Sequence, residues 1–141
     1  MELTGRCYCG AISLNVKKRP ETVALCHCTD CRRVTGAAVA AFAAFSQDAV
    51  AISPDPGDGF EVTPGVRRWF CHTCGSPLAA TFDYLPEQIY VPVGVLDFAD
   101  ELTPELQCHS ANKPPWFETL HQLPKHEKSA RIHLQSARPK P

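Results

Sequence analysis

Eight cysteines in short, regular spacings constrain this chain more than any other feature of its sequence. They form a CxC motif (Cys7, Cys9), a CxCxxC motif (Cys26, Cys28, Cys31), a CxxC motif (Cys71, Cys74) and a single Cys108. The first residues, MELTGRCYCG, lack the basic start and apolar stretch of a signal peptide, so we expect a cytoplasmic location. In a reducing compartment such spacings favour metal binding over disulfides.

Length and charge exclude several classes of protein. A chain of 141 residues with 44% hydrophobic residues has the size of one globular domain, and no apolar run is long enough to span a membrane. We place the domain at residues 1–124 and a basic, solvated tail at 125–141. The tail holds five Lys or Arg and one Glu, which leaves the rest with a net charge of −5. This balance disfavours a nucleic-acid surface.

The residue pattern predicts a mainly β fold. Thirteen prolines and eight glycines interrupt the chain too often for long helices. Short runs with strand character cover residues 11–16, 21–26, 36–45, 66–71, 78–85 and 88–97. Pro92 interrupts the last run and indicates a sheet edge or a bulge. Two short helices are expected, one just after Cys31 and one near 116–121.

Two of the cysteine motifs together predict a closed zinc site. The CxxC motif at Cys71 and Cys74 suits a tight turn that aims both sulfurs at one point, and Gly75 provides the permissive backbone that such turns often need. In an extended strand Cys7 and Cys9 share a face, so both can reach one ion. The two pairs supply the four thiolates of a structural zinc, which would tie the N-terminal strand to the middle of the chain.

A second zinc site remains for the triplet Cys26, Cys28 and Cys31. Three protein ligands with one exchangeable position are the pattern of catalytic zinc, so we interpret these cysteines as the catalytic centre and expect two zinc ions per chain. In the alternative, Cys108 closes the site as a fourth thiolate and makes it inert; His109 is a further candidate for that position. His27 lies between two ligands and is expected to point away from the metal.

Five segments carry a resemblance to a known family. They are GRCYCGAISL at 5–14, CHCTDCRRVTGAA at 26–38, FCHTCGSPL at 70–78, VPVGVLD at 91–97 and PPWF at 114–117. In order and spacing they resemble the glutathione-dependent formaldehyde-activating enzyme family, also called the centromere protein V-like or GFA domain. The three cysteine motifs together are highly specific for it, whereas any one of them alone would not be.

The resemblance implies an Mss4-like (β-tent) fold of several small antiparallel sheets around the zinc sites. It also implies the same division of the cysteines into a structural zinc and a more accessible one. The activity named for the family joins glutathione to formaldehyde as S-hydroxymethylglutathione and is classed as a carbon–sulfur lyase activity. The sequence departs from the family pattern at Gln107, which stands where a histidine is usual, just before Cys108 and His109.

These inferences predict a zinc-dependent carbon–sulfur lyase, similar to S-(hydroxymethyl)glutathione synthase, acting on a glutathione or small-thiol adduct of an aldehyde. Arg32 and Arg33 follow the last ligand and would pair with substrate carboxylates, or else lie solvated on the surface. Trp116 would wall the pocket with Pro115, or else pack in the core. Asp30 is expected to accept a proton or to cap the backbone. The competing class is a non-catalytic zinc-stabilised binding module; a homo-oligomer is compatible with both.

Overall fold

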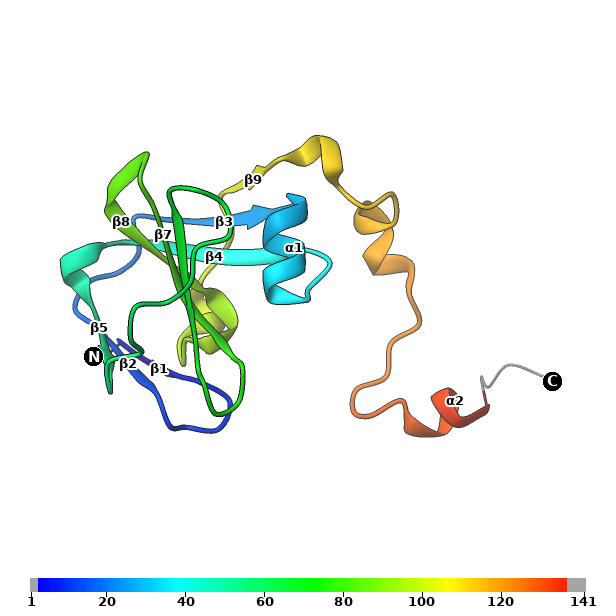
Figure 1. Cartoon of the computed structure of the whole chain (residues 1–141). Helices are drawn as coiled ribbons and strands as arrows, with labels where there is room; N and C mark the ends of the chain where they lie inside the picture. The colour runs from blue at the N-terminus through cyan, green and yellow to red at the C-terminus, as the bar shows by residue number, and fades with distance from the viewer. Residues whose placement is uncertain (1–2, 137–141) are drawn as a thin grey trace.

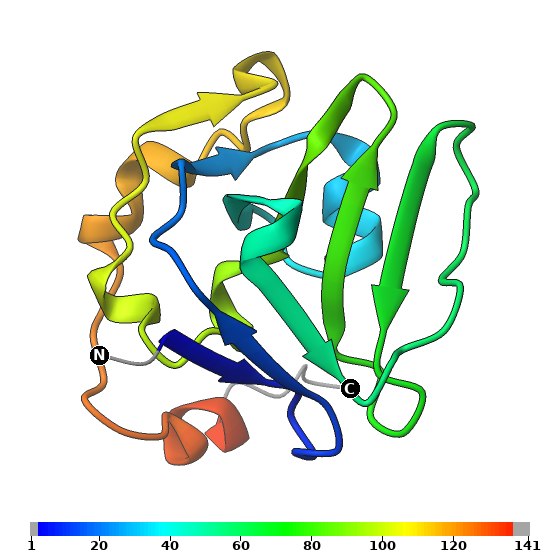
Figure 2. The same ribbon diagram turned by 90° about the vertical axis from the view of Figure 1, so that its left-hand side faces the viewer.

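Two β-sheets enclose the core of the computed structural model, which describes residues 3–136 (Figure 1, Figure 2). The smaller sheet is antiparallel, in the order β1-β2-β5, and consists of β1 (Leu3–Arg6), β2 (Ser13–Val16) and β5 (Val50–Ser53). The larger sheet has the order β6-β7-β8-β4-β3-β9. Its strands are β3 (Thr22–Cys26), β4 (Ala40–Ser46), β6 (Val66–Phe70), β7 (Pro77–Phe82), β8 (Leu85–Pro92) and β9 (Leu106–Cys108). The predicted mainly β fold of small sheets is confirmed.

Helices are short, in keeping with the many prolines and glycines. The α-helices are α1 (Thr29–Thr35) and α2 (Arg131–Ser136), and the 3₁₀ helices are η1 (Gln47–Ala49), η2 (Val93–Val95), η3 (Ala99–Glu101), η4 (Ser110–Asn112) and η5 (Phe117–Gln122). The helix expected near 116–121 is η5, whereas the one expected after Cys31 begins earlier and contains that cysteine. Across residues 3–136, no helix combines the length and the apolar character needed to cross a membrane.

The core lies where the two sheets face each other. In β2 the buried Leu14 and Val16 alternate with exposed polar residues, as the period of the predicted strand required. Leu14 packs in one cluster with Phe45 of β4 and Leu78 of β7, all of which are almost completely buried. Burial of apolar surface at about 25 cal/mol per Å² is the main force that holds the two sheets together.

Strand β4 is the centre of the larger sheet and is buried on both faces. It pairs with β3 on one side and β8 on the other, and four consecutive residues, Phe42 to Phe45, are buried. A strand covered on both faces reads as a continuous apolar run, which is why the 36–45 segment shows no alternation. The strand begins later than predicted because Gly36, with φ of 72°, ends α1 in the left-handed conformation.

Two predicted strands end in the wrong place, and the interpretation of Pro92 is wrong as well. Pro92 marks neither an edge nor a bulge: it is the last residue of β8, a strand with neighbours on both sides, and the 3₁₀ helix η2 follows it. A proline has no N–H to continue the ladder, so the run predicted at 88–97 stops there. The run predicted at 78–85 is divided by the turn between β7 and β8, because residues 83 and 84 form that turn.

Strand β9 has no counterpart in the sequence-based prediction. It pairs parallel to β3, with Gln107 opposite Leu25 and Cys108 opposite Cys26, so one neighbouring pair in the larger sheet is not antiparallel. Three mostly exposed residues carry no periodic signal that would reveal such a strand. After β9 the chain leads away from both sheets and reaches α2, all of whose residues are exposed (Figure 1).

Candidate functional site

Four cysteines from two distant turns converge on one point. Their sulfur atoms all lie within 4.8 Å of one another: Cys7, Cys9, Cys71 and Cys74. The Cys7 and Cys9 sulfurs are 3.6 Å apart, and the Cys9 and Cys71 sulfurs are 3.8 Å apart. A tetrahedron with zinc–sulfur bonds of about 2.3 Å has edges of about 3.8 Å, so the spacing fits a tetrahedral ion.

The two turns position these sulfurs in similar ways. β1 ends at Arg6, so Cys7 and Cys9 lie on a turn and not on the extended strand that the sequence predicted. The N–H of Gly75 donates to the carbonyl of Cys71 at 2.7 Å, and Gly75 has a φ of 79°, which is the permissive conformation expected of it. Each pair of cysteines therefore sits on a tight turn that points both sulfurs inward.

Ser76 links the two turns and acts on one of the sulfurs. Its hydroxyl accepts a hydrogen bond from the Tyr8 N–H at 2.9 Å and lies 3.2 Å from the sulfur of Cys74. The hydrogen bond from the Ser76 side chain is the main reason that the pKa of Cys74 falls to about 5. A thiol with this pKa is a thiolate at neutral pH, which is the form that binds metal.

The second cluster is formed where strand β3 leads into helix α1. The sulfur atoms of its three members lie within 4.8 Å of one another: Cys26, Cys28 and Cys31. Cys26 ends the strand, and Cys28 is the N-cap of α1, accepting a hydrogen bond of 3.2 Å from the Cys31 N–H. Cys28 therefore takes the capping role that Asp30 was a candidate for, which leaves Asp30 exposed in the first helical turn.

The surroundings of the triplet favour a bound cation. Burial raises the pKa of Cys26 and of Cys31. Burial would raise the pKa of Cys28 as well, but hydrogen bonds, that of the Cys31 N–H foremost, lower it. Three sulfurs this close carry their negative charges together only when a cation compensates them. Soft thiolate donors at this spacing fit zinc, and both clusters can hold a metal ion.

Cys108 lies beside the triplet without joining it. It is the parallel partner of Cys26 across the β3–β9 pair, and its carbonyl accepts a hydrogen bond of 3.0 Å from the His27 N–H. Among the described residues its sulfur does not belong to the group within 4.8 Å, and neither does any nitrogen of His109. Among the described residues the sulfurs near this point thus form a group of three, and Cys108 lies outside it.

His27 points away from the cysteines that flank it, as expected. Its ring is almost completely buried, and its Nε2 donates to Oε1 of Gln107 at 2.8 Å. The ring also contacts Phe117 edge-on, with centroids 5.1 Å apart. Gln107, the position at which the sequence departs from the family pattern, therefore contacts the segment that carries the triplet and does not point to a metal.

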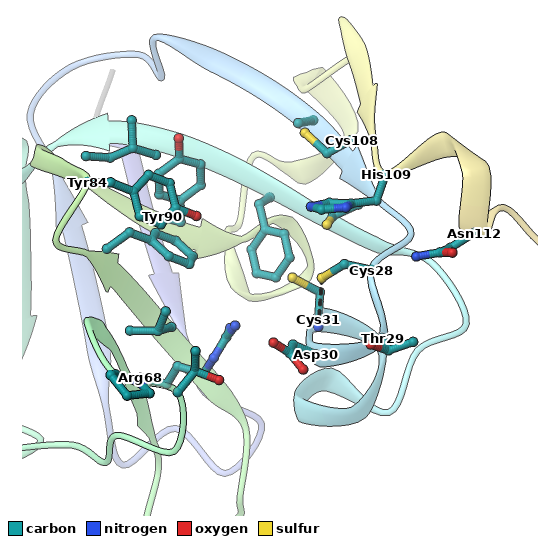
Figure 3. Close-up of a pocket in the computed structure, with 18 residues that line it drawn as sticks. Cys28, Thr29, Asp30, Cys31, Arg68, Tyr84, Tyr90, Cys108, His109 and Asn112 are labelled. Atoms are coloured by element: carbon teal, nitrogen blue, oxygen red, sulfur yellow. Dashed lines mark hydrogen bonds between the residues drawn. The ribbon is translucent and has the colours of Figure 1, made fainter.

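A cavity of about 600 Å³ opens beside the triplet (Figure 3). Its wall on the side of the larger sheet is aromatic and includes Phe42, Phe82, Tyr84 and Tyr90. The Phe82 ring lies 5.3 Å from Tyr90 in a T-shaped pair and 5.5 Å from Tyr84. Burial raises the pKa of Tyr90, so its hydroxyl stays protonated and donates to Gln88 at 2.9 Å. Sequence reasoning missed this wall, because aromatic residues in β-strands are common in any sheet.

Charged side chains at the cavity come from two elements. Arg68 of β6 lines it, with its guanidinium carbon 5.8 Å from the centroid of the Phe82 ring, and Asp30 of α1 lines it as well. In Figure 3 both side chains lie below the aromatic wall. Arg67, the preceding residue, pairs instead with Glu61 at 3.6 Å. Sequence reasoning assigned no chemistry to these arginines, although a strand must point two adjacent side chains to opposite faces.

The substrate contacts expected from the sequence lie outside this cavity. Arg32 and Arg33 are exposed on α1 and are not among the residues that line it. Arg33 borders a smaller hollow of about 300 Å³ next to it, together with Asp30 and Arg68. Trp116 is half exposed, at 50%, and belongs neither to the cavity wall nor to the core.

Comparison with known proteins adds an independent line of evidence. The sequence model of one family, described as "Glutathione-dependent formaldehyde-activating enzyme", matches residues 2–112. A crystal structure of a Rhodobacter sphaeroides protein is similar, with a TM-score of 0.57 and 25% sequence identity over 74% of this chain and 98% of that one. No curated protein matches the sequence. The matched region contains both cysteine clusters and ends before η5.

Proposed function

Because the chain belongs to the glutathione-dependent formaldehyde-activating enzyme family, we propose that it is a zinc-dependent carbon–sulfur lyase of that type. Its substrate is an adduct of a small thiol, such as glutathione, with an aldehyde, such as formaldehyde. The observation that supports this most directly is the position of the three-cysteine cluster in the wall of a cavity large enough for a small molecule. A purely structural metal site would have no need of such a cavity.

The two clusters take different parts in this proposal. The cluster of Cys7, Cys9, Cys71 and Cys74 holds a structural zinc, since four thiolates fill a tetrahedron. The cluster of Cys26, Cys28 and Cys31 holds the zinc of the reaction. Zinc bound there supplies a Lewis acid that favours the thiolate form of a substrate sulfur.

The reaction needs only a proton transfer and one carbon–sulfur bond. In the synthetic direction, the substrate thiol loses its proton, its sulfur forms a bond to the aldehyde carbon, and the carbonyl oxygen takes up a proton. Asp30 is the only carboxylate among the described residues that line the cavity, so we assign it the transfer of that proton. The aromatic wall limits the access of water to the reacting atoms.

Arg32, Arg33 and Trp116 remain proposed contacts for the outer part of a long substrate. They lie outside the cavity wall, so they would meet only the portion of a substrate that extends beyond it. For glutathione this portion would include a peptide carboxylate, for which an arginine is the suitable partner.

Exchange NMR of glutathione with formaldehyde tests the proposal. The zinc-loaded protein should accelerate formation of the adduct above the uncatalysed background. Cys28→Ser, which removes a ligand exposed to the cavity, should abolish the acceleration, whereas Cys108→Ser, outside the ligand set, should retain it. If the fully metal-loaded protein accelerates no pairing of a small thiol with an aldehyde, the proposal is wrong and a zinc-stabilised binding module is the better description.

A further inference from the structure

We propose that Arg68 binds a carboxylate of the substrate inside the cavity. From the same wall we infer that the preferred thiol has an aromatic or apolar body and a single carboxylate. This inference rests on the proposed function, because it names the thiol whose adduct the cavity accepts. It moves the recognition of the substrate's charge from the exposed helix α1 to strand β6.

Arg68 has donors to offer a ligand. Its side chain is half-buried and faces the cavity, and within residues 3–136 its guanidinium makes no ion pair and no hydrogen bond to another side chain or to the backbone. A guanidinium carries five N–H donors in a planar fork that matches the two oxygens of a carboxylate. The guanidinium carbon lies 5.8 Å from the centroid of the Phe82 ring, within the range of a cation–π contact.

Arg67 shows what a structural arginine on the same strand looks like. It pairs with Glu61 at 3.6 Å and donates a hydrogen bond of 2.8 Å to the carbonyl of Asp58. Its donors are therefore used within the protein, on the face of β6 that is not part of the cavity. The contrast between the two neighbours indicates that the cavity-facing arginine serves something other than the fold.

The rest of the wall selects the body of the ligand. Phe42, Phe82 and Tyr90 present rings to the cavity, and the only permanently charged side chains among its described lining residues are Arg68 and Asp30. A flat apolar body would stack against such rings, which favours an aromatic ring in the ligand. Peptide groups laid against the faces of these rings would lack hydrogen-bond partners, and a polar group buried without one costs free energy.

Charge counting separates the candidates. Glutathione brings two carboxylates and one ammonium group, and the described lining residues offer one permanently charged cation, Arg68, and one carboxylate, Asp30, to receive them. Its second carboxylate would have to reach outside the wall. A thiol with one carboxylate can place its sulfur at Cys28 and its carboxylate at Arg68, which lie on different sides of the cavity in Figure 3.

Binding of matched thiols to the zinc-loaded full chain tests the inference. The probes are 4-mercaptophenylacetate, its neutral amide of nearly the same shape, and glutathione, all measured by calorimetry. We expect the carboxylate to bind about tenfold tighter than the amide or better, and tighter than glutathione. Arg68→Met should bring the carboxylate-to-amide ratio to near one, while the matched control Arg67→Met should leave it unchanged.

Three results would overturn the inference. The first is a carboxylate-to-amide affinity ratio near one in the wild type, which decides even if the variant does not fold. The second is a ratio that survives Arg68→Met, and the third is glutathione binding as tightly as the monocarboxylate. Phenylacetate and phenylacetamide, which lack a thiol, separate the two proposals: a preference for phenylacetate that depends on Arg68 supports the inference even where no thiol binds and the proposed function fails.

Discussion

The Nε2 of His27 donates a hydrogen bond of 2.8 Å to Oε1 of Gln107, and this contact joins the segment of the three-cysteine cluster to strand β9. His27 is the one buried polar side chain of the described core, and its Nδ1 has no partner within residues 3–136. Within the described part of the chain, the amide of Gln107 therefore provides the only hydrogen bond to this buried imidazole.

Replacing Gln107 should destabilise the protein. Gln107→Leu leaves a buried N–H of His27 without an acceptor, which costs about 1–3 kcal/mol in the free energy of unfolding. Chemical denaturation measures this change. Gln122→Leu, on the exposed helix η5, is the control and should be close to neutral. A neutral Gln107→Leu would show that the contact does not support β9.

The two cysteine clusters should respond differently to removal of one ligand. The four-cysteine cluster joins residues 62 positions apart, since Cys9 meets Cys71, and structural zinc contributes on the order of 10 kcal/mol to folding. Cys71→Ser should therefore prevent stable folding. Cys28→Ser should fold and bind one zinc per chain, because its cluster spans only residues 26–31. Circular dichroism measures the folding of both variants, and metal analysis measures their zinc content. A folded Cys71→Ser protein with two zinc ions would contradict the structural role of the four-cysteine cluster.

Zinc retention in acid should depend on Ser76. Its hydrogen bond keeps the pKa of Cys74 at about 5, below the ordinary value of 9.0, so the thiolate form is favoured in the folded state and is lost as pH falls through about 5. Ser76→Ala removes the donor and should raise the pH at which this zinc is released to a chromogenic chelator. Ser76→Thr keeps the hydroxyl and should release zinc at the wild-type pH. Equal release pH for all three proteins would refute this role.

Gly5 should tolerate no side chain. A Cβ at this position would lie 2.5 Å from the carbonyl oxygen of Val95. The backbone comes this close because Gly5 of β1 forms an isolated antiparallel bridge with Leu96. Gly5→Ala should cost about 1–3 kcal/mol through this overlap with backbone. Gly94→Ala is the control, because nothing lies within 4 Å of its Cβ. Thermal unfolding distinguishes the two variants. Equal midpoint temperatures would contradict the prediction, because they would mean that the backbone near Val95 shifts at no cost to accommodate the added Cβ.

Local spacing made the cysteine clusters predictable. A CxxC pair such as Cys71 and Cys74 encodes its own turn, so the sequence indicates which sulfurs meet without knowledge of the sheets. The alternation of buried and exposed residues in β2 was predictable for the same reason, because apolar and polar residues alternate along the strand. The boundaries of β8 were not, because nothing local distinguishes a proline that ends a strand from one at its edge.

The cavity depends on long-range register, which the sequence does not show. Cys108 lies beside Cys26 only because β9 pairs parallel to β3, and a three-residue strand has no periodic signal. Arg68 faces the cavity, and Arg67 does not, because β6 pairs with β7 in one register and not in the next. The sequence instead pointed to Arg32 and Arg33, which are near the triplet along the chain but outside the cavity wall.

The central claim is that the protein has two separate zinc centres, one with four cysteine ligands and one with three. X-ray absorption of the zinc coordination tests this claim most directly. The zinc-loaded wild type should contain two zinc ions that together bind seven protein sulfurs, four in one cluster and three in the other. Cys108→Ala should leave that number unchanged. Eight sulfurs in the wild type, falling to seven in Cys108→Ala, would show that Cys108 closes the second site and would contradict the account.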